Sequence, residues 1–206
     1  MGLFGRIGKG EPYDWLVVGL GNPGEKYAGT RHNVGEEAVR LLAERRGVTL
    51  KGGRDNALVA ETRLAGPHGD QRVVLAFPIT FMNESGQAVS GLVRRYRIET
   101  PEQIIVVQDE LDLPPGELKI KAGGGLAGHN GLRSITQHLK TQDYLRVRIG
   151  VGKPDHKNVG KGHVLSKVPK HERELLDIQI ANAADAVELI IARGVDAAMQ
   201  RYNGKP

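Results

Sequence analysis

The sequence contains no cysteine, which excludes disulfides, thiolate zinc sites and cysteine nucleophiles. It also has no run of about 18 apolar residues, so we expect no segment that crosses a membrane. Residues 1–14 are rich in glycine and basic side chains, and they lack the long apolar core of a signal peptide. We therefore expect a cytoplasmic protein in which residues 1–14 form a flexible arm.

Two common signatures of hydrolytic sites are also missing. No G-x-S-x-G pattern surrounds Ser85, Ser90, Ser134 or Ser166, so the sequence offers no serine nucleophile elbow. No H-E-x-x-H pattern or other tight ligand cluster indicates zinc. The sequence therefore predicts no metal site, and a hydrolytic reaction would have to use water as its nucleophile.

The positive charge of the chain is concentrated in one segment. Twenty-nine Lys or Arg against 24 Asp or Glu give a net charge of +5, and residues 145–170 alone hold seven Lys or Arg and one Asp, a net of +6. The rest of the chain therefore sums to −1. Such a segment favours a polyanionic partner, and the alternative is a solvated loop whose lysines only aid solubility. Charge alone leaves both open.

The order of apolar patterns predicts a single α/β domain over residues 15–206. Strand patterns at residues 15–20, 103–107 and 145–151 alternate with helix patterns, which is typical of a largely parallel sheet. A hairpin over residues 56–77 would make the sheet mixed. We expect a twisted mixed sheet flanked by helices, with residues 117–121 as an edge strand.

Helix boundaries are expected at residues with capping chemistry. Asn33 and Glu36 match a capping box, and Gly47 can end the helix that follows. Asn83 can cap a second helix. Two further helices are expected over residues 131–139 and 171–193.

The turn after the first strand fits a nucleotide-binding pattern. Gly19, Gly21 and Gly24 have the spacing G-x-G-x-x-G, the fingerprint of a dinucleotide-binding βαβ unit. That unit needs a helix directly after the glycines and an acidic residue at the end of the next strand. Here the helical pattern begins only at Val34, no suitable acidic residue follows, and Pro23 removes an N–H group. The sequence therefore indicates a tight turn, and it argues against a nicotinamide-dependent oxidoreductase.

Polar residues follow three of the expected strands. Asn22 follows the first strand, Asn83 follows the hairpin after a short link, and Asp109 follows the apolar run at residues 103–107. Ligands of α/β sheets bind beyond the carboxyl ends of the strands. We expect these three side chains to converge on one site.

Five segments of the sequence form a recognisable series: GLGNPGEKYAGTRHNVG, FMNESG, QDELDLPPG, GGGLAGHNGLRSI and YLRVRIGVGKP. In this order and spacing they resemble bacterial peptidyl-tRNA hydrolases, from about residue 15 to beyond residue 190. The resemblance implies hydrolysis of the ester between a peptide and the 3′ ribose of tRNA, which frees the tRNA for translation and contributes to ribosome rescue. It also implies no metal, no cofactor, no obligate protein partner and a monomer.

Carried over residue by residue, the resemblance implies that His32 is the catalytic base and Asp109 its partner. The implied substrate contacts are Asn22, Tyr27, Phe81, Asn83 and Asn130, with Met82 and His129 at the periphery of the cleft. Asn22 would sense the blocked amino group of the substrate. The residues expected to hold tRNA phosphates are Lys121, Arg133, Lys153, Lys157 and Lys161. Residues 153–167, rich in glycine and lysine, are also expected to act as a lid.

The residues around His32 suit a general base. The expected helix start beside it favours the neutral imidazole, and Asp109 can fix the ring tautomer by accepting from one nitrogen. The carboxylate also favours the protonated ring, so the two influences oppose each other. The alternative is a surface histidine that helps to cap a helix, and the asparagines could be turn or cap residues. A non-catalytic RNA-binding relative is also conceivable, but it would need neither His32 nor Asp109.

Overall fold

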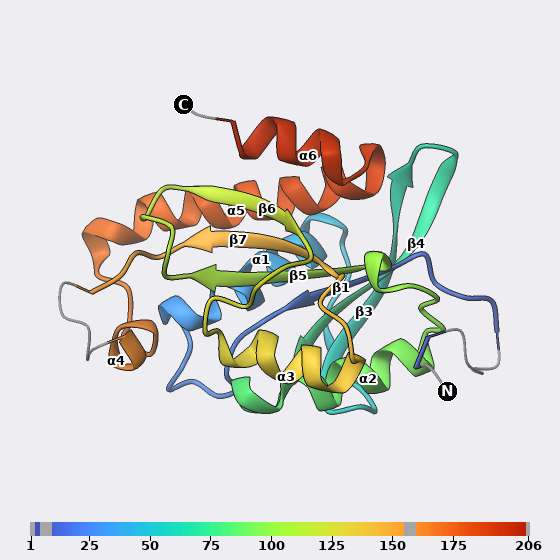
Figure 1. Ribbon diagram of the computed structural model, residues 1–206, viewed down its shortest axis with the longest axis horizontal. Helices are drawn as coiled ribbons and strands as arrows, with labels where there is room; N and C mark the ends of the chain where they lie inside the picture. The colour runs from blue at the N-terminus through green and yellow to red at the C-terminus, as the bar shows by residue number, and fades with distance from the viewer. Residues whose placement is uncertain (1–2, 5–9, 155–159, 205–206) are drawn as a thin grey trace.

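The computed structural model describes residues 3–4, 10–154 and 160–204. Its seven strands form one sheet in the order β2-β3-β4-β1-β5-β7-β6 (Figure 1). The strands are β1 Trp15–Gly19, β2 Lys51–Gly52, β3 Ala57–Gly66, β4 Gly69–Pro78, β5 Ile104–Glu110, β6 Leu118–Ala122 and β7 Leu145–Gly150. The α-helices are α1 Val34–Arg45, α2 Ser85–Arg95, α3 Asn130–Leu139, α4 Gly160–Val164, α5 Lys170–Arg193 and α6 Val195–Tyr202. Short 3-10 turns are η1 Arg31–Asn33, η2 Met82–Glu84 and η3 Pro101–Gln103.

Parallel pairing occupies the centre of the sheet, and antiparallel pairing occupies both edges. β1 pairs parallel with β4 and β5, and β5 pairs parallel with β7. The pairs β2–β3, β3–β4 and β6–β7 are antiparallel. The predictions of a mixed sheet flanked by helices, of the hairpin and of the β6 edge strand are confirmed. The expectation of a largely parallel sheet is wrong, because three of the six described strand pairs are antiparallel. Because β1, β5 and β7 run the same way, the residues after them meet at one end of the molecule.

Helices cover both faces of the sheet (Figure 1). α1, α5 and α6 contribute to one hydrophobic core, and α2 and α3 contribute to the other. Side chains of β5 alternate between the two, with Ile104 and Val106 on the α2–α3 side and Ile105 and Val107 on the α1–α5 side. By the same period of two, Asp109 points to the side of α1. None of the described helices is both long and apolar enough to cross a membrane.

Close packing of α1 on the sheet explains Gly19 at the end of β1 and Gly35 in α1. A Cβ atom on Gly19 would lie 2.3 Å from the carbonyl oxygen of Gly35, and a Cβ atom on Gly35 would lie 2.1 Å from that of Val107. Only glycine permits such an approach between a helix and a strand. α1 begins at Val34, as predicted, and not directly after Gly24. These glycines therefore serve helix–strand packing.

The capping prediction is wrong for Asn83, and for Asn33 it is confirmed in position but not in the cap hydrogen bond. Asn33 occupies the N-cap position of α1, but its side chain makes no cap hydrogen bond because it binds the backbone of Asn22. The N-cap position of α2 belongs to Glu84, whereas Asn83 lies inside η2. A 3-10 turn precedes each of these helices. At α2 this turn moves the N-cap position from Asn83 to Glu84, whereas α1 begins directly after Asn33, as expected.

The end of the N-terminal arm is bound to the body of the protein. The backbone N–H of Tyr13 donates to the carbonyl of Tyr96, and the two rings meet edge-on with centroids 5.0 Å apart. The backbone N–H of Arg72 donates to a carboxylate oxygen of Asp14 at 2.6 Å. The expected flexible arm over residues 1–14 therefore does not include Tyr13 and Asp14, and residues 1–2 and 5–9 lie outside the described part.

Candidate active site

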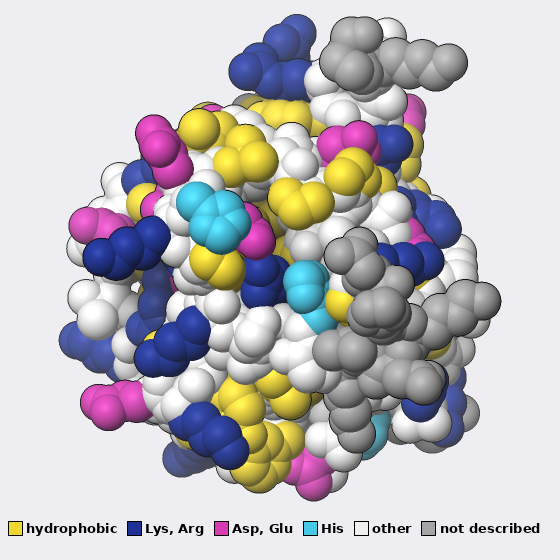
Figure 2. Space-filling view, turned by 90° about the vertical axis from the view of Figure 1, so that its left-hand side faces the viewer, with side chains coloured by type: hydrophobic (Ala, Val, Ile, Leu, Met, Phe, Trp, Pro, Cys, Tyr) yellow, Lys and Arg dark blue, Asp and Glu magenta, His cyan; other side chains and the backbone are white. Residues whose placement is uncertain are grey.

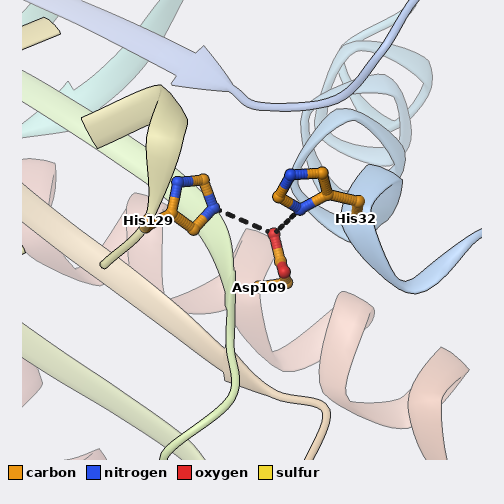
Figure 3. Close-up of side chains that lie close together, drawn as sticks. All are labelled: His32, Asp109 and His129. Atoms are coloured by element: carbon orange, nitrogen blue, oxygen red, sulfur yellow. Dashed lines mark hydrogen bonds and ion pairs between the residues drawn. The ribbon is translucent and has the colours of Figure 1, made fainter. Parts of the chain in front are cut away.

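Three side chains from distant parts of the chain meet at the end of β5 (Figure 3). His32 Nδ1 lies 2.8 Å from Asp109 Oδ1, and His129 Nε2 lies 3.0 Å from the same oxygen. His32 belongs to η1, and His129 occupies the N-cap position of α3. Asp109 is 2% exposed. One buried carboxylate oxygen therefore links the starts of two helices to the central sheet.

The hydrogen bonds give the two histidines different tautomers. His129 Nδ1 accepts from the backbone N–H groups of Gly131 and Leu132, at 3.1 and 3.4 Å. Its proton must then be on Nε2, which donates to Asp109. His32 uses Nδ1 toward Asp109, and its Nε2 makes no hydrogen bond with any described residue. Of the two rings, only His32 has a nitrogen ready to accept a proton.

The carboxyl group of Asp109 is held in its ionised form. Burial by itself would raise the pKa of this group, but the charges and hydrogen bonds of His32 and His129 lower that pKa below its ordinary value. An ionised acceptor fixes the Nδ1–H tautomer of His32. It also stabilises the positive charge that His32 gains when it takes a proton.

The same three residues have the spacing of metal ligands. Among the described residues, His32, Asp109 and His129 form the one group of three or more His, Asp or Glu side chains whose ligand atoms all lie within 4.8 Å of one another. Imidazole and carboxylate would suit a divalent transition metal. A cation here would have to displace the two ring protons that Asp109 accepts. That the site works without a metal stays a prediction.

Asn22 is held in place by Asn33, the residue that the sequence predicted as a helix cap. Asn33 is fully buried; its Oδ1 accepts from the backbone N–H of Asn22, and its Nδ2 donates to the Asn22 carbonyl, both at 2.9 Å. Asn22 Oδ1 accepts from the backbone N–H of Met82 at 2.8 Å. The oxygen of the Asn22 amide is thus engaged, which leaves its NH2 group to donate to a ligand.

The bond between Asn22 and Met82 joins two of the predicted substrate regions. Phe81, next to Met82, is 54% exposed, and its ring meets Tyr27 edge-on with centroids 6.5 Å apart. Asn83, on the other side of Met82, is exposed on η2. The structure therefore gathers an aromatic pair and two asparagines around a buried methionine.

The remaining predicted cleft residues lie at the start of α3. Asn130 is the first residue of α3 and is exposed. His129, expected at the periphery of the cleft, instead contacts Asp109 directly. The His–Asn–Gly sequence at the expected helix start could have indicated that His129 is the N-cap residue, because a ring nitrogen can accept from the first backbone N–H groups of a helix.

The basic segment at residues 145–170 includes arginines that serve the fold. Arg146 is 2% exposed and donates to the carbonyls of Gly124 and Gly125 at 2.6 and 2.8 Å. Arg148 pairs with the buried Glu110 at 3.0 Å. The charge that this segment offers to a polyanion is therefore smaller than the sequence suggests.

Five residues were predicted to hold phosphates, and the three whose side chains the structure describes lie at the surface. Lys121 is half-buried on β6 beside Gly124, Arg133 is exposed on α3, and Lys153 is exposed in a surface ion pair. Lys157 lies outside the described residues, and of Lys161 only its place in α4 is described. Figure 2 views this end of the molecule, where Lys and Arg side chains lie at the surface around the visible histidines.

Comparisons with known proteins agree with this arrangement. The family model described as peptidyl-tRNA hydrolase matches residues 16–206. The peptidyl-tRNA hydrolase of Frankia casuarinae is 51% identical over 189 residues, which are 92% of this chain and 93% of that protein. That of Cutibacterium acnes is 48% identical over 196 residues, covering 92% and 98%. The crystal structure of peptidyl-tRNA hydrolase from Acinetobacter baumannii superposes with a TM-score of 0.84 at 41% identity, covering 95% and 98%. The chain belongs to the peptidyl-tRNA hydrolase family.

Proposed function

We propose that the protein cleaves the ester between a peptide and the 3′ ribose of tRNA with a water molecule activated by His32. Hydrolysis of peptidyl-tRNA with release of tRNA is the activity of the family to which the chain belongs. The observation that carries the choice of base is the hydrogen bond from His32 Nδ1 to Asp109, which leaves Nε2 open. His129 is not the base, because both of its ring nitrogens are engaged.

In the proposed reaction, His32 Nε2 takes a proton from water as the water oxygen attacks the ester carbonyl carbon. The carbonyl electrons move onto oxygen, and Asp109 stabilises the imidazolium that forms. When the carbonyl re-forms, the bond to the ribose oxygen breaks and His32 returns its proton to that oxygen. The products are a peptide acid and a tRNA with a free 3′ end.

Three asparagines supply polar groups for the substrate. Asn22 offers its NH2 group, since its oxygen is bound to Met82, and this donor suits the carbonyl of the first peptide bond. A free amino acid on tRNA lacks that carbonyl, which accounts for selectivity toward blocked substrates. Asn130 stands at the start of α3, where its side-chain NH2 group and the helix dipole favour a developing oxyanion, since the N–H groups of Gly131 and Leu132 are taken by His129. Asn83 is exposed beside this region and can contact peptide or ribose.

The tRNA is held from outside this cleft. The edge-on pair Tyr27 and Phe81 offers an exposed aromatic surface for the unpaired 3′ end or for apolar peptide side chains. Lys121, Arg133 and Lys153 lie near the glycine loop and β7 and would contact phosphates, together with Lys157 and Lys161. Such binding falls steeply with salt and is nearly independent of base sequence.

The lid, the cellular compartment and the oligomeric state are further parts of this proposal. Residues 153–167 would act as a lid over the substrate whose far end is fixed, because Ser166 and Lys167 are bonded to Arg31 and Thr30. Residues 155–159 lie outside the described part. The protein would act in the cytoplasm as a monomer without an obligate protein partner.

Turnover of N-acetyl-aminoacyl-tRNA by the wild type and by His32→Ala tests the proposal. General base catalysis contributes roughly 10²–10⁴-fold, so the variant should lose at least 10²-fold in kcat. His68→Ala, which replaces an exposed histidine in the turn between β3 and β4, is the matched control and should keep full activity. Unblocked aminoacyl-tRNA should stay intact in every case. Full activity of a folded His32→Ala would exclude His32 as the base, and salt-sensitive tRNA binding without turnover by the wild type would favour a scaffold role.

A further inference from the structure

Arg31, the residue before His32, is bound to a distant part of the chain. Its side chain is only 7% exposed. One guanidinium nitrogen, Nη2, lies 2.5 Å from Glu172 Oε2, and the other, Nη1, donates to Ser166 Oγ at 2.8 Å. A buried guanidinium is costly unless its donors are paired, and here both terminal nitrogens have partners. The side chain therefore fixes the start of η1 to the segment that leads into α5.

The backbone reinforces the same contact. The Arg31 N–H points to the carbonyl of Ser166 at 3.4 Å, and Thr30 forms an isolated antiparallel bridge with Lys167. The N–H of Val168 donates to the carbonyl of Gly29 at 3.1 Å. Residues 29–31 and 166–168 therefore run side by side, and α4 lies against η1.

η1 needs outside support. It is a 3-10 turn of three residues without a side-chain cap hydrogen bond, and such turns have poor hydrogen-bond geometry of their own. On one side of His32, the buried Asn33 ties the turn to the Asn22 loop. On the other side, Arg31 ties it to Ser166 and Glu172. The turn that carries His32 is thus held by two anchors, and only the anchor at Asn33 involves a predicted substrate-binding residue, Asn22.

We propose that Arg31 is a positioning residue that keeps the His32 ring within hydrogen-bond distance of Asp109. It does so by fixing η1 to residues 166–172, and it contacts neither the reacting atoms nor the His32 ring. The inference rests on the proposed role of His32 as the base. Its consequence is that the segment from Ser166 to Glu172 sets the geometry of the base from outside the substrate cleft.

A neighbouring ion pair offers a matched control. Arg173, the residue after Glu172, pairs with Glu37 on α1 and so also connects α5 to the N-terminal part of the chain. Unlike Arg31, this pair does not touch η1. A role of Arg31 in stability alone would make the two pairs equivalent, whereas a positioning role makes them different.

The experiment compares Arg31→Gln, Arg31→Lys and Glu172→Gln with Glu37→Gln. The first readout is kcat and KM with N-acetyl-aminoacyl-tRNA, and the second is the proton NMR signal of the His32 Nδ1–H bonded to Asp109. Because small misplacements of reacting groups can cost up to about 10²-fold, Arg31→Gln should lower kcat by about 10-fold or more with KM within about twofold. Its proton signal should broaden or move. Arg31→Lys, which keeps one ion pair, should be intermediate, and Glu37→Gln should change only the unfolding temperature.

The outcomes separate this inference from the proposed function. An unchanged proton signal and an unchanged kcat in folded Arg31→Gln would overturn the positioning role, and so would equal losses of kcat in Arg31→Gln and Glu37→Gln. A disturbed proton signal with full activity would support the positioning role and remove His32 as the base. If Arg31→Gln does not fold, Glu172→Gln decides, since it keeps the guanidinium and its bond to Ser166.

Discussion

Replacement of Asp109 with asparagine measures what the carboxylate charge contributes to the base. His32 Nδ1 and His129 Nε2 both contact the same oxygen, Asp109 Oδ1. An asparagine of the same shape can turn its single amide oxygen to that place, because both rings present N–H groups there. Both hydrogen bonds and both tautomers then survive, and only the charge is lost.

The expected loss follows from the difference between charged and neutral hydrogen bonds. A bond to a charged group contributes about 1.5–3 kcal/mol and a neutral one about 0.5–1.5 kcal/mol, so each bond loses about 1–1.5 kcal/mol. Each 1.36 kcal/mol corresponds to a tenfold change in rate. If the loss is felt only at His32, kcat should fall about 10-fold; if the bond to His129 also counts, the fall approaches about 10²-fold.

The assay is steady-state turnover of N-acetyl-aminoacyl-tRNA, with Glu110→Gln as a control. Glu110 follows Asp109 on β5, is also buried and pairs with Arg148, so its loss should lower stability and leave kcat within about twofold. Activity of Asp109→Asn within twofold of the wild type would refute the contribution of the charge. A fall well beyond about 10²-fold would refute the shared-oxygen argument, because it would mean that the amide presents its NH2 group and reverses the tautomers.

Three further results are expected. Asn33→Ala removes two buried hydrogen bonds to Asn22 and should lower the free energy of unfolding by about 2–3 kcal/mol, together with kcat. Denaturant titration measures the free energy, and an unchanged unfolding midpoint would contradict this prediction. Gly35→Ala puts a Cβ atom 2.1 Å from the Val107 carbonyl oxygen and should lower the free energy of unfolding by about 3 kcal/mol or more. A soluble variant of normal stability would contradict this and show that α1 can shift freely. Because the folded pKa of Asp109 is lowered, its stabilisation is present above about pH 4 and is lost as the pH falls through the folded pKa. The difference in unfolding free energy between the wild type and Asp109→Asn should therefore shrink as the pH falls below about 4, and a difference that stays constant down to about pH 2 would contradict this assignment.

Much of the fold was readable because its signals are local. Apolar runs and alternation predicted β1, β5, β7 and the β3–β4 hairpin, since the side-chain period of a strand is a property of neighbouring residues. The family was likewise readable from motifs whose order and spacing are fixed in the sequence, and the comparisons confirm it. The catalytic roles of His32 and Asp109 stay predictions, although the structure places the two residues in contact.

Local signals failed where a side chain had two possible partners. Asn33 has the sequence context of a helix cap, yet it binds the backbone of Asn22 because η1 brings that loop within reach. His129 was expected at the periphery, yet it shares the oxygen of Asp109. Arg146 was counted as free charge, yet it is buried under the glycine loop.

The sequence by itself determined the order of strands and helices, the bends that only glycine allows and the set of polar residues available for chemistry. The tertiary structure decided which of those residues meet. Arg31 and Glu172 are 141 positions apart, and His32 and Asp109 are 77 apart. Pairings at such separations depend on how α1, β5 and α5 pack together, and that packing depends on the whole core and not on any short stretch of residues.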